Sequence, residues 1–336
     1  MADMARKKRI LTVSLAAALL FGAGFSSVDA AQTLPAADAK KAQTMASISG
    51  MASVPGGNIC MVDTENHSVW MRLKKDDYAL LAGIPGNAGY TDGTLTQARF
   101  NSPWSVAAYG EGYLISDTGN HVIRRIDGDQ VTTFAGIAKE PGILNGKADA
   151  ATFNRPTGLA VADDGTVYVA DTENHTIRAI DADGIVTTFA GAAGEPGCEN
   201  GTLAQARFCE PTGLFYKNGA LYVADSGNHR ICRIANGKVK IVAGSDNGAE
   251  GDAVGEPMQA ALSNPQQMTV YRGVLYIADT GNGCIKCLQD GKLALVLEAN
   301  SRRQGRIPAE PRALMARNGY LYMGDMFAGD IYRVKL

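Results

Sequence analysis

From about residue 46 onward, the chain consists of short stretches in which hydrophobic and polar positions alternate, separated by glycine-containing turns. A period of two is the pattern of a half-buried β-strand, and no window shows a convincing 3.6-residue period of an amphipathic helix. Between residues 157 and 190 the pattern predicts four consecutive strands, which we name strands a to d. They cover residues 157–162, 166–170, 176–180 and 185–190.

The same four-strand unit recurs along the chain, with an Asp-Thr/Ser-x-Asn-His turn between strands b and c. Five copies of this turn stand 54 residues apart, and a degraded sixth copy follows near the C-terminus. The recurring turn residues are Asp63, Asn66 and His67; Asp117, Asn120 and His121; Asp171, Asn174 and His175; Asp225, Asn228 and His229; Asp279 and Asn282; and Asp325.

Six such units predict an all-β fold, a six-bladed β-propeller of four-stranded antiparallel blades over residues 46–336. Four strands in a repeat of roughly 40–50 residues are typical of propeller blades, whereas solenoid repeats are shorter. The last recognisable strand, residues 331–335, is strand c of the sixth unit. The N-terminal segment, residues 31–45, is expected to supply its missing strand d and so to pair the two chain ends.

The motif Asp-Thr-Gly-Asn-His at residues 117–121, with Arg-Pro-Thr-Gly-Leu-Ala-Val at 155–161, resembles the NHL repeat, which is named for an Asn-His-Leu triplet. The third position differs here, because Val122, Thr176 and Arg230 follow the histidines. The resemblance covers nearly all of residues 46–336 and implies the propeller fold. It also implies an interaction domain, although related six-bladed propellers include metal-dependent lyases and lactonase-type hydrolases.

The repeated turn residues are interpreted as structural. The Asp carboxylate is expected to accept a backbone N–H two residues on, as in an Asx-turn, and the Asn to adopt a left-handed conformation. The His is expected to bridge to the neighbouring blade. The alternative is a ring of metal ligands, but these positions stand about 9.5 Å outside strand a, too far apart for several to share one ion. All four histidines occupy this position, so none is left as an obvious catalytic base.

Function is therefore expected where the units differ. The d-to-a and b-to-c connections emerge on the same side, which we call the top face. Around the mouth of the central channel on this face, the residues that flank the start of strand a vary. The predicted ligand-binding residues are Trp104, Arg155, Thr157, Glu210, Thr212, Gln266, Glu310 and Arg312. Such a mixture suits a polar ligand with an apolar part, and the alternative is a solvated rim of salt bridges.

The chain has no P-loop, no G-x-S-x-G elbow and no H-E-x-x-H motif. The predicted function is a scaffold that binds a protein, a peptide or a small polar ligand through the top face, with no catalytic residue and no cofactor assigned. The alternative is a metal-dependent lyase or lactonase-type hydrolase that holds a Ca or Zn ion at the central channel, with Glu210 and Glu310 among its ligands.

The N-terminus has the pattern of a secretory signal peptide, residues 1–30. Four basic residues at 6–9 precede an apolar run at 10–25, and Val-Asp-Ala at 28–30 resembles a cleavage site. An uncleaved anchor is the alternative, although the run is short for a membrane span. The pattern predicts a secreted or cell-envelope protein. The net charge of −2 offers no broad basic surface for nucleic acid.

Six cysteines accompany this export signal, and an exported protein can form disulfides. Cys198 and Cys209 stand near the two ends of one d-to-a loop, so they are the candidates for a local disulfide. Cys284 and Cys287 form a C-x-x-C pattern on a predicted strand. Residues three apart on a strand face opposite sides, which favours core packing for this pair.

Overall fold

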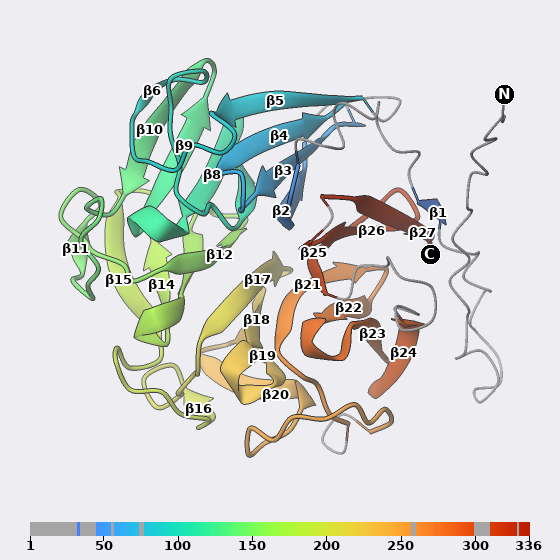
Figure 1. The fold of residues 1–336 in the computed structure, drawn as a ribbon. Coiled ribbons are helices and arrows are strands. Elements are labelled where there is room, and N and C mark those ends of the chain that lie inside the picture. The colour runs from blue at the N-terminus through green and yellow to red at the C-terminus, as the bar shows by residue number, and fades with distance from the viewer. Residues whose placement is uncertain are drawn as a thin grey trace, which may run out of the picture.

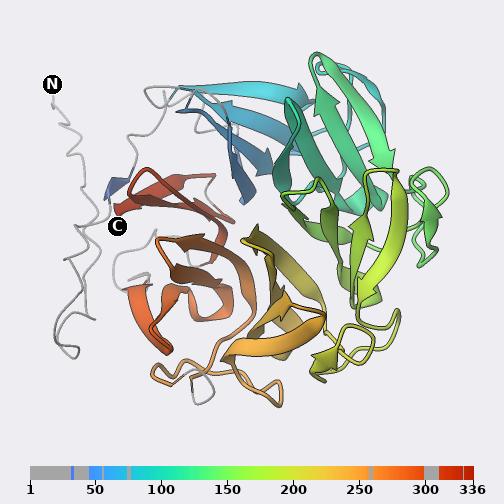
Figure 2. The same cartoon turned by 180° about the vertical axis from the view of Figure 1, so that it is seen from behind.

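The computed structural model describes residues 45–336, apart from 55–56, 74–76, 257–259, 299–309 and 328, together with the short strand at 32–33. Six sheets stand side by side around a common axis, which confirms the all-β, six-bladed propeller (Figures 1 and 2). Among the described residues, no helix has the length and apolar character that a membrane crossing needs. The predicted signal peptide, residues 1–30, lies outside the described residues.

Each blade runs outward from strand a at the axis, so strands that are consecutive in the chain are neighbours in the sheet. Blades 1 to 3 comprise β2 (Ile48–Ser53), β3 (Ile59–Asp63), β4 (Ser68–Arg72) and β5 (Tyr78–Gly83); β7 (Val106–Tyr109), β8 (Gly112–Asp117), β9 (Val122–Asp127) and β10 (Gln130–Ala135); and β12 (Pro156–Val161), β13 (Val167–Asp171), β14 (Thr176–Ile180) and β15 (Ile185–Ala190).

Blades 4 to 6 comprise β17 (Pro211–Lys217), β18 (Ala220–Asp225), β19 (Arg230–Ala235) and β20 (Lys238–Gly244); β21 (Pro265–Tyr271), β22 (Val274–Asp279), β23 (Cys284–Gln289) and β24 (Lys292–Glu298); and β25 (Pro311–Arg317), β26 (Tyr320–Asp325) and β27 (Ile331–Lys335). In the sixth blade the outermost strand is β1 (Gln32–Thr33), which pairs antiparallel with β27, Gln32 opposite Arg333. The two ends of the chain therefore share one sheet.

The long d-to-a loops contain a feature that the alternation pattern does not reveal. Three of them add a two-residue strand to the outer edge of the blade that follows: β6 (Gly93–Thr94), β11 (Gly146–Lys147) and β16 (Gly201–Thr202). Each begins with a glycine at φ between 134° and 138°, a conformation that side-chain-bearing residues rarely adopt. The Asp-Gly and Asn-Gly turns of these loops thus protect the outer sheet edge.

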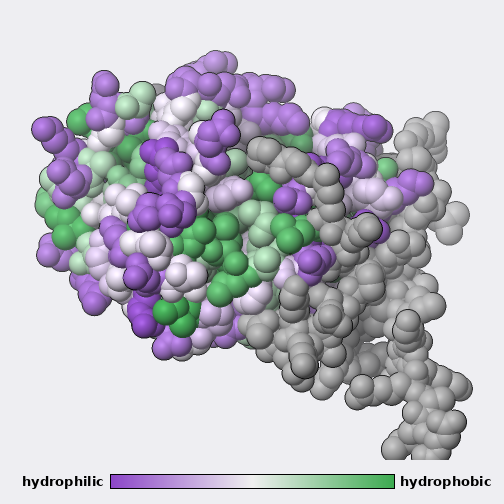
Figure 3. Space-filling view, turned by 90° about the horizontal axis from the view of Figure 1, so that it is seen from above, coloured by the Kyte–Doolittle hydropathy of each residue, from purple (hydrophilic) through white to green (hydrophobic). Residues whose placement is uncertain are grey.

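Most of the apolar core lies between blades rather than within one blade. One buried cluster, for example, joins Ile177 and Ala190 of blade 3 to Leu214 and Val223 of blade 4. Figure 3 shows the propeller from the side, where hydrophilic residues predominate and a hydrophobic patch lies near the centre of the view. The exposed large hydrophobic side chains among the described residues are Leu80, Ile143, Leu144, Val254 and Phe327.

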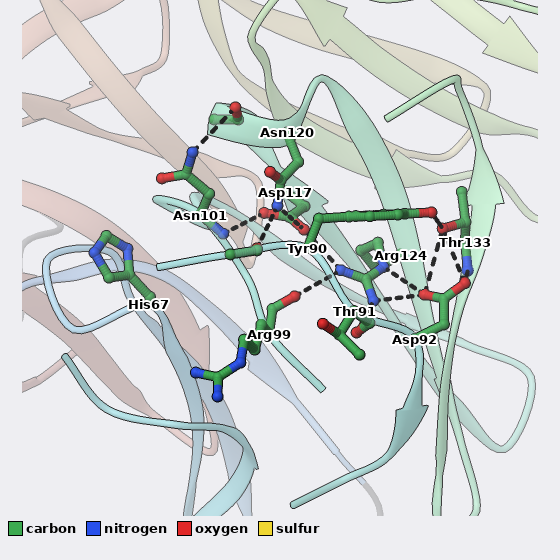
Figure 4. Close-up of polar contacts among 12 residues, drawn as sticks. His67, Tyr90, Thr91, Asp92, Arg99, Asn101, Asp117, Asn120, Arg124 and Thr133 are labelled. Carbon is green, nitrogen blue, oxygen red and sulfur yellow. Dashed lines mark hydrogen bonds and ion pairs between the residues drawn. The ribbon is translucent and has the colours of Figure 1, made fainter. Parts of the chain in front are cut away.

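The repeated Asp is the centre of a buried polar network in each of blades 2 to 5 (Figure 4). In blade 2, the Asp117 carboxylate accepts the backbone N–H of Asn101 at 2.7 Å and the Asn120 amide at 2.8 Å. It also accepts the guanidinium of Arg124 at 2.8 Å, and both side chains of this ion pair are fully buried. The network, which we call the Asp lock, ties the d-to-a loop to strands b and c.

The buried cation of the Asp lock escaped the sequence analysis. Arg178 and Lys286 occupy the position of Arg124 in blades 3 and 5, whereas blade 4 supplies Arg230 two residues earlier. The guanidinium of Arg124 also lies 5.1 Å from the ring centroid of Phe100, the loop's buried anchor. The sequence signal is a basic residue five or seven positions after the repeated Asp.

Two predictions about the repeated turn are wrong for blades 2 to 5. The turn is a single 3₁₀ turn, η2 (Thr118–Asn120), η3 (Thr172–Asn174), η4 (Ser226–Asn228) or η5 (Thr280–Asn282), and the Asp side chain does not cap it. The left-handed residue is the one that follows the Asn, with φ of 53° to 61°. The Asn is instead held by its amide, which donates to the Asp carboxylate and to a loop carbonyl. Only Asp325, in blade 6, accepts the N–H two residues on as predicted, from Phe327.

The histidine does bridge to the neighbouring blade, as predicted. His121 Nδ1 accepts the backbone N–H of Arg155 at 3.1 Å, and His67, His175 and His229 make the equivalent bond at 3.0–3.1 Å. The turn hydroxyl crosses the same seam, since Thr118 donates to the carbonyl of Pro156 at 2.5 Å. Each of the first four seams between blades therefore carries two directed hydrogen bonds.

The seam between blades 6 and 1 differs from these four. Met326 and Gly329 stand where the other blades have the hydroxyl and the histidine, so neither bond can form. The seam is filled instead by apolar side chains such as Met45, Ile48 and Met315. The ring is thus closed at this seam by hydrophobic contact together with a hydrogen bond from Arg317 Nη1 to the carbonyl of Asn58 at 2.9 Å.

Replacing the buried cation of one Asp lock should destabilise the propeller far more than replacing a surface cation beside it. Arg124→Met leaves Asp117 buried without its cation, and we expect a loss of about 3–5 kcal/mol. The matched control is Arg125→Met on the same strand, because Arg125 pairs with Asp127 at the surface and should cost less than about 1 kcal/mol. Denaturant unfolding measures both. Equal losses for the two variants would contradict a lock that depends on the buried pair.

Asp325 in blade 6 should make stability depend on pH. Its pKa is raised to about 6, chiefly by burial; the N–H of Phe327 opposes this rise, and the charges of Asp330 and Glu310 add to it. Because the folded state holds this proton more tightly than the unfolded chain, the group favours folding below about pH 4, and this contribution is lost as the pH rises through 6.

Asp325→Asn should therefore stabilise the protein by about 1–2 kcal/mol at pH 8 and much less at pH 4. Unfolding free energies of both proteins across this range measure the effect. A difference between variant and parent that stays constant with pH would rule out this role.

Candidate functional site

The residues one position after the strand-a proline, or after Ile48 that replaces it in blade 1, form a ring around the axis on the top face, which we call the axial ring. Its members are Ser49, Trp104, Thr157, Thr212, Gln266 and Arg312. The small side chain of Ser49 in blade 1 donates to the carbonyl of Trp104 at 2.8 Å. Blades 6 and 2 flank blade 1, and the guanidinium of Arg312 lies over the Trp104 ring, 4.7 Å from its centroid. Two residues predicted for the site are therefore brought together across blade 1.

Arg312 differs from the buried arginines of the Asp locks. Among the described residues it makes no hydrogen bond or ion pair, and its Nε is buried without a partner. Partial burial lowers the pKa of Arg312, while Glu310 and Glu65 raise it through their charges. Glu65 lies in the blade 1 turn, at the variable position before Asn66, and the sequence analysis did not assign it to the site.

The hydroxyls of the axial ring take part in holding the blades together. Thr157 and Thr212 are buried, and each lies 2.5–2.6 Å from the turn hydroxyl of its own blade. Each also donates to a carbonyl of the next blade, Thr212 and Gln266 respectively, at 3.2 Å. The Gln266 amide donates to Asn264, but its Oε1 is buried without a partner. The two threonines are therefore structural, whereas Gln266 keeps an open acceptor.

Arg155 and Glu210 lie directly before the strand-a proline, two positions before the axial-ring residue of their blade, and both are exposed. Arg155 forms a 3.5 Å ion pair with Glu173 at the surface. The backbone N–H groups of Arg155 and Glu210 each donate to the histidine of the preceding blade. The partial burial of His121, helped by the Arg155 charge, lowers the pKa of that histidine. The neutral imidazole is the form that can accept this bond. On this side of the ring, the solvated-rim alternative describes the arrangement better.

The predicted Cys198–Cys209 disulfide is not formed in this structure, where all six cysteines are free thiols. The Sγ of Cys209 points toward the b-to-c turn, only 2.7 Å from where a Cβ on Gly227 would be. It therefore packs against the glycine of that turn rather than across the loop. Cys284 and Cys287 are buried in blade 5, in agreement with core packing.

One group of the described residues has side chains close enough to share a metal ion: Asp252, Asp279 and Cys284. It belongs to the blade 5 Asp lock and not to the axial ring. The ammonium of Lys286 is bonded to Asp252 at 2.8 Å and to Asp279 at 2.7 Å. These carboxylates already have a cation, and the predicted ligands Glu210 and Glu310 are not part of the group.

The comparisons with known proteins bear on fold and family. Residues 139–289 match the family model of the teneurin NHL domain. The chain is 30% identical to NHL repeat-containing protein 2 of Gallus gallus over 269 residues, which covers 69% of this chain and 37% of that protein. The chain thus spans little more than a third of the length of the curated relatives it matches first.

Solved structures share the fold at low sequence identity. An auxiliary nutrient binding protein from Bacteroides thetaiotaomicron superposes with a TM-score of 0.63 at 12% identity, covering 87% of this chain and 69% of that one. A gluconolactonase from Xanthomonas campestris superposes with a TM-score of 0.62 at 15% identity, covering 91% and 89%. The repeated turn, the six blades and the NHL relatives agree, and the chain belongs to the NHL-repeat family.

Proposed function

We propose that this protein is an exported binding scaffold whose top face holds a protein, a peptide or a small polar ligand at Trp104 and Arg312. The observation that carries the proposal is the guanidinium of Arg312, which lies over Trp104 and makes no hydrogen bond or ion pair with another described residue. Buried donors are nearly always paired in folded proteins, so one that is unpaired next to an aromatic face is a candidate contact for a ligand.

Three further features support this reading. In blades 1 to 4 the repeated Asp, Asn and His of the turn are bonded within the scaffold and are not free for chemistry. The signal-peptide pattern at residues 1–30 supports export. A shared fold also extends to a Bacteroides protein described as an auxiliary nutrient binding protein. Fold alone does not fix function, so the argument depends on the site.

The double variant Trp104→Ala, Arg312→Ala should lose the partner of the top face. Parent and variant are immobilised at equal density and exposed to an extract of the cells that make the protein, and retained molecules are quantified by mass spectrometry. We expect at least one molecule to be retained by the parent and reduced about tenfold or more by the variant, as for contacts at the centre of an interface.

The matched control is Arg233→Ala. Arg233 also lies over an aromatic ring, that of Tyr222, at 6.0 Å, but it is exposed in blade 4 and outside the axial ring. It should retain the partner at the level of the parent. Retention that is the same for all three proteins would refute the assignment of Trp104 and Arg312.

The alternative, a metal-dependent lyase or lactonase-type hydrolase, makes a different prediction about metal content. Because Lys286 already neutralises the one described group with metal-ligand spacing, we expect less than about 0.1 Ca or Zn ion per purified chain. Elemental analysis of the desalted protein measures this. One stoichiometric ion that resists a chelator wash would favour the enzyme, and turnover of a lactone would establish it.

A further inference from the structure

Four buried polar atoms without a hydrogen-bond partner lie on three consecutive blades, among the residues that the structure describes. Three of them flank the start of strand a: Ser47 Oγ in blade 1, Gln266 Oε1 in blade 5 and Arg312 Nε in blade 6. A fourth, Asp325 Oδ2, lies in the strand register opposite Pro311, directly before Arg312. Strand β25 packs between β2 and β21, so these atoms belong to one sector of the top face.

This sector also combines charges of both signs. Arg312 carries the positive charge, and Glu310 and Glu65 are close enough to act on it electrostatically. Neither carboxylate forms an ion pair with Arg312 within 4 Å, so the three charges lie near one another without pairing directly. A purely anionic ligand would meet two like charges here, and a purely cationic one would meet the guanidinium.

Apolar surface stands beside these charges. Trp104 is only partly buried beneath Arg312, and Phe327 in the blade 6 turn is 66% exposed. Both Phe327 and Met326 depart from the repeat, which has Thr or Ser and then Gly or Glu at these positions. The face of Trp104 beside the partly desolvated guanidinium of Arg312 suits an apolar side chain of a bound molecule.

We propose that this sector binds a zwitterion with an apolar side chain, whose carboxylate contacts Arg312 and whose ammonium contacts Glu310 and Glu65. Free α-amino acids and short peptides share this chemistry. A carboxylate matches the planar donors of a guanidinium. Gln266 Oε1 and Ser47 Oγ are buried acceptors that lack a partner, and they can receive N–H groups only from a ligand that enters this sector. The inference rests on the proposed binding function and names the class of ligand.

The test uses L-phenylalanine and two analogues that each lack one charge, 3-phenylpropanoate and phenethylamine. Binding to the purified protein is measured at pH 7 by calorimetry and by the fluorescence of Trp104, with Trp104→Phe as the optical control. We expect L-phenylalanine to bind at least about tenfold more tightly than either analogue. Each analogue leaves one charged group of the protein, either Arg312 or the carboxylates, partly buried and without a partner. The dipeptide Phe-Gly, run beside it, distinguishes a free amino acid from a peptide as the better ligand.

Variants assign the two charges separately. Arg312→Gln should weaken the binding of L-phenylalanine and of 3-phenylpropanoate about tenfold and leave that of phenethylamine unchanged. Glu310→Gln should weaken the binding of phenethylamine and leave that of 3-phenylpropanoate unchanged. Arg233→Gln is the control, and thermal unfolding checks that each variant is folded. Equal affinity for all probes, no affinity for any zwitterion, or binding that survives Arg312→Gln would overturn the proposal.

The outcome can be separated from that of the proposed function. If the extract experiment shows a partner that depends on Trp104 and Arg312 while no zwitterion binds, the scaffold function stands and the ligand class is wrong. If zwitterions bind but no partner depends on these residues, the site is a small-molecule site and the protein-binding scaffold is refuted.

Discussion

The structure depends on one constraint: the buried carboxylate of the repeated Asp must be surrounded by hydrogen-bond donors. The repeated Asp at the end of strand b is fully buried in blades 2 to 5. A charge in that position is tolerated only with a cation and hydrogen bonds around it. The donors come from three places: a backbone N–H of the preceding loop, the turn Asn and a cation on strand c. One side chain thereby fixes the loop, the turn and the strand pair at once.

Because the lock fixes the loop, it also determines how the blades meet. The loop residue that donates to the Asp lies directly before the residue whose N–H donates to the neighbouring histidine, as Asn154 does before Arg155. The backbone between them takes a positive φ, at 51° for Arg155. A strained conformation of this kind persists where several bonds over-determine it. Blade geometry and seam geometry are therefore coupled through two consecutive residues.

The sequence was sufficient for the fold because the fold is a property of the repeat. The spacing of the turns and the period-two alternation predicted the strands 176–180 and 185–190 at the bounds observed for β14 and β15. It was not sufficient for the bonds inside the turn. A repeat shows which residues recur but not which atoms they meet, so the Asp was assigned a local N–H when its donors lie 16 residues earlier and seven residues later. The cation escaped notice because it shifts position in blade 4 and is absent from blades 1 and 6.

The same reasoning explains why a site can exist where blades 6 and 1 meet. In blades 2 to 5 every repeated polar group is engaged, and changing one would expose a buried charge. Blade 6 has Met326, Phe327 and Gly329 in place of the repeat residues, and no described cation forms an ion pair with the buried Asp325. The seam is held by apolar contacts and by the bond from Arg317 to Asn58, neither of which uses the turn residues of the repeat. Polar groups of this sector are thus free to face a ligand, while the Asp locks of the other four blades maintain the ring.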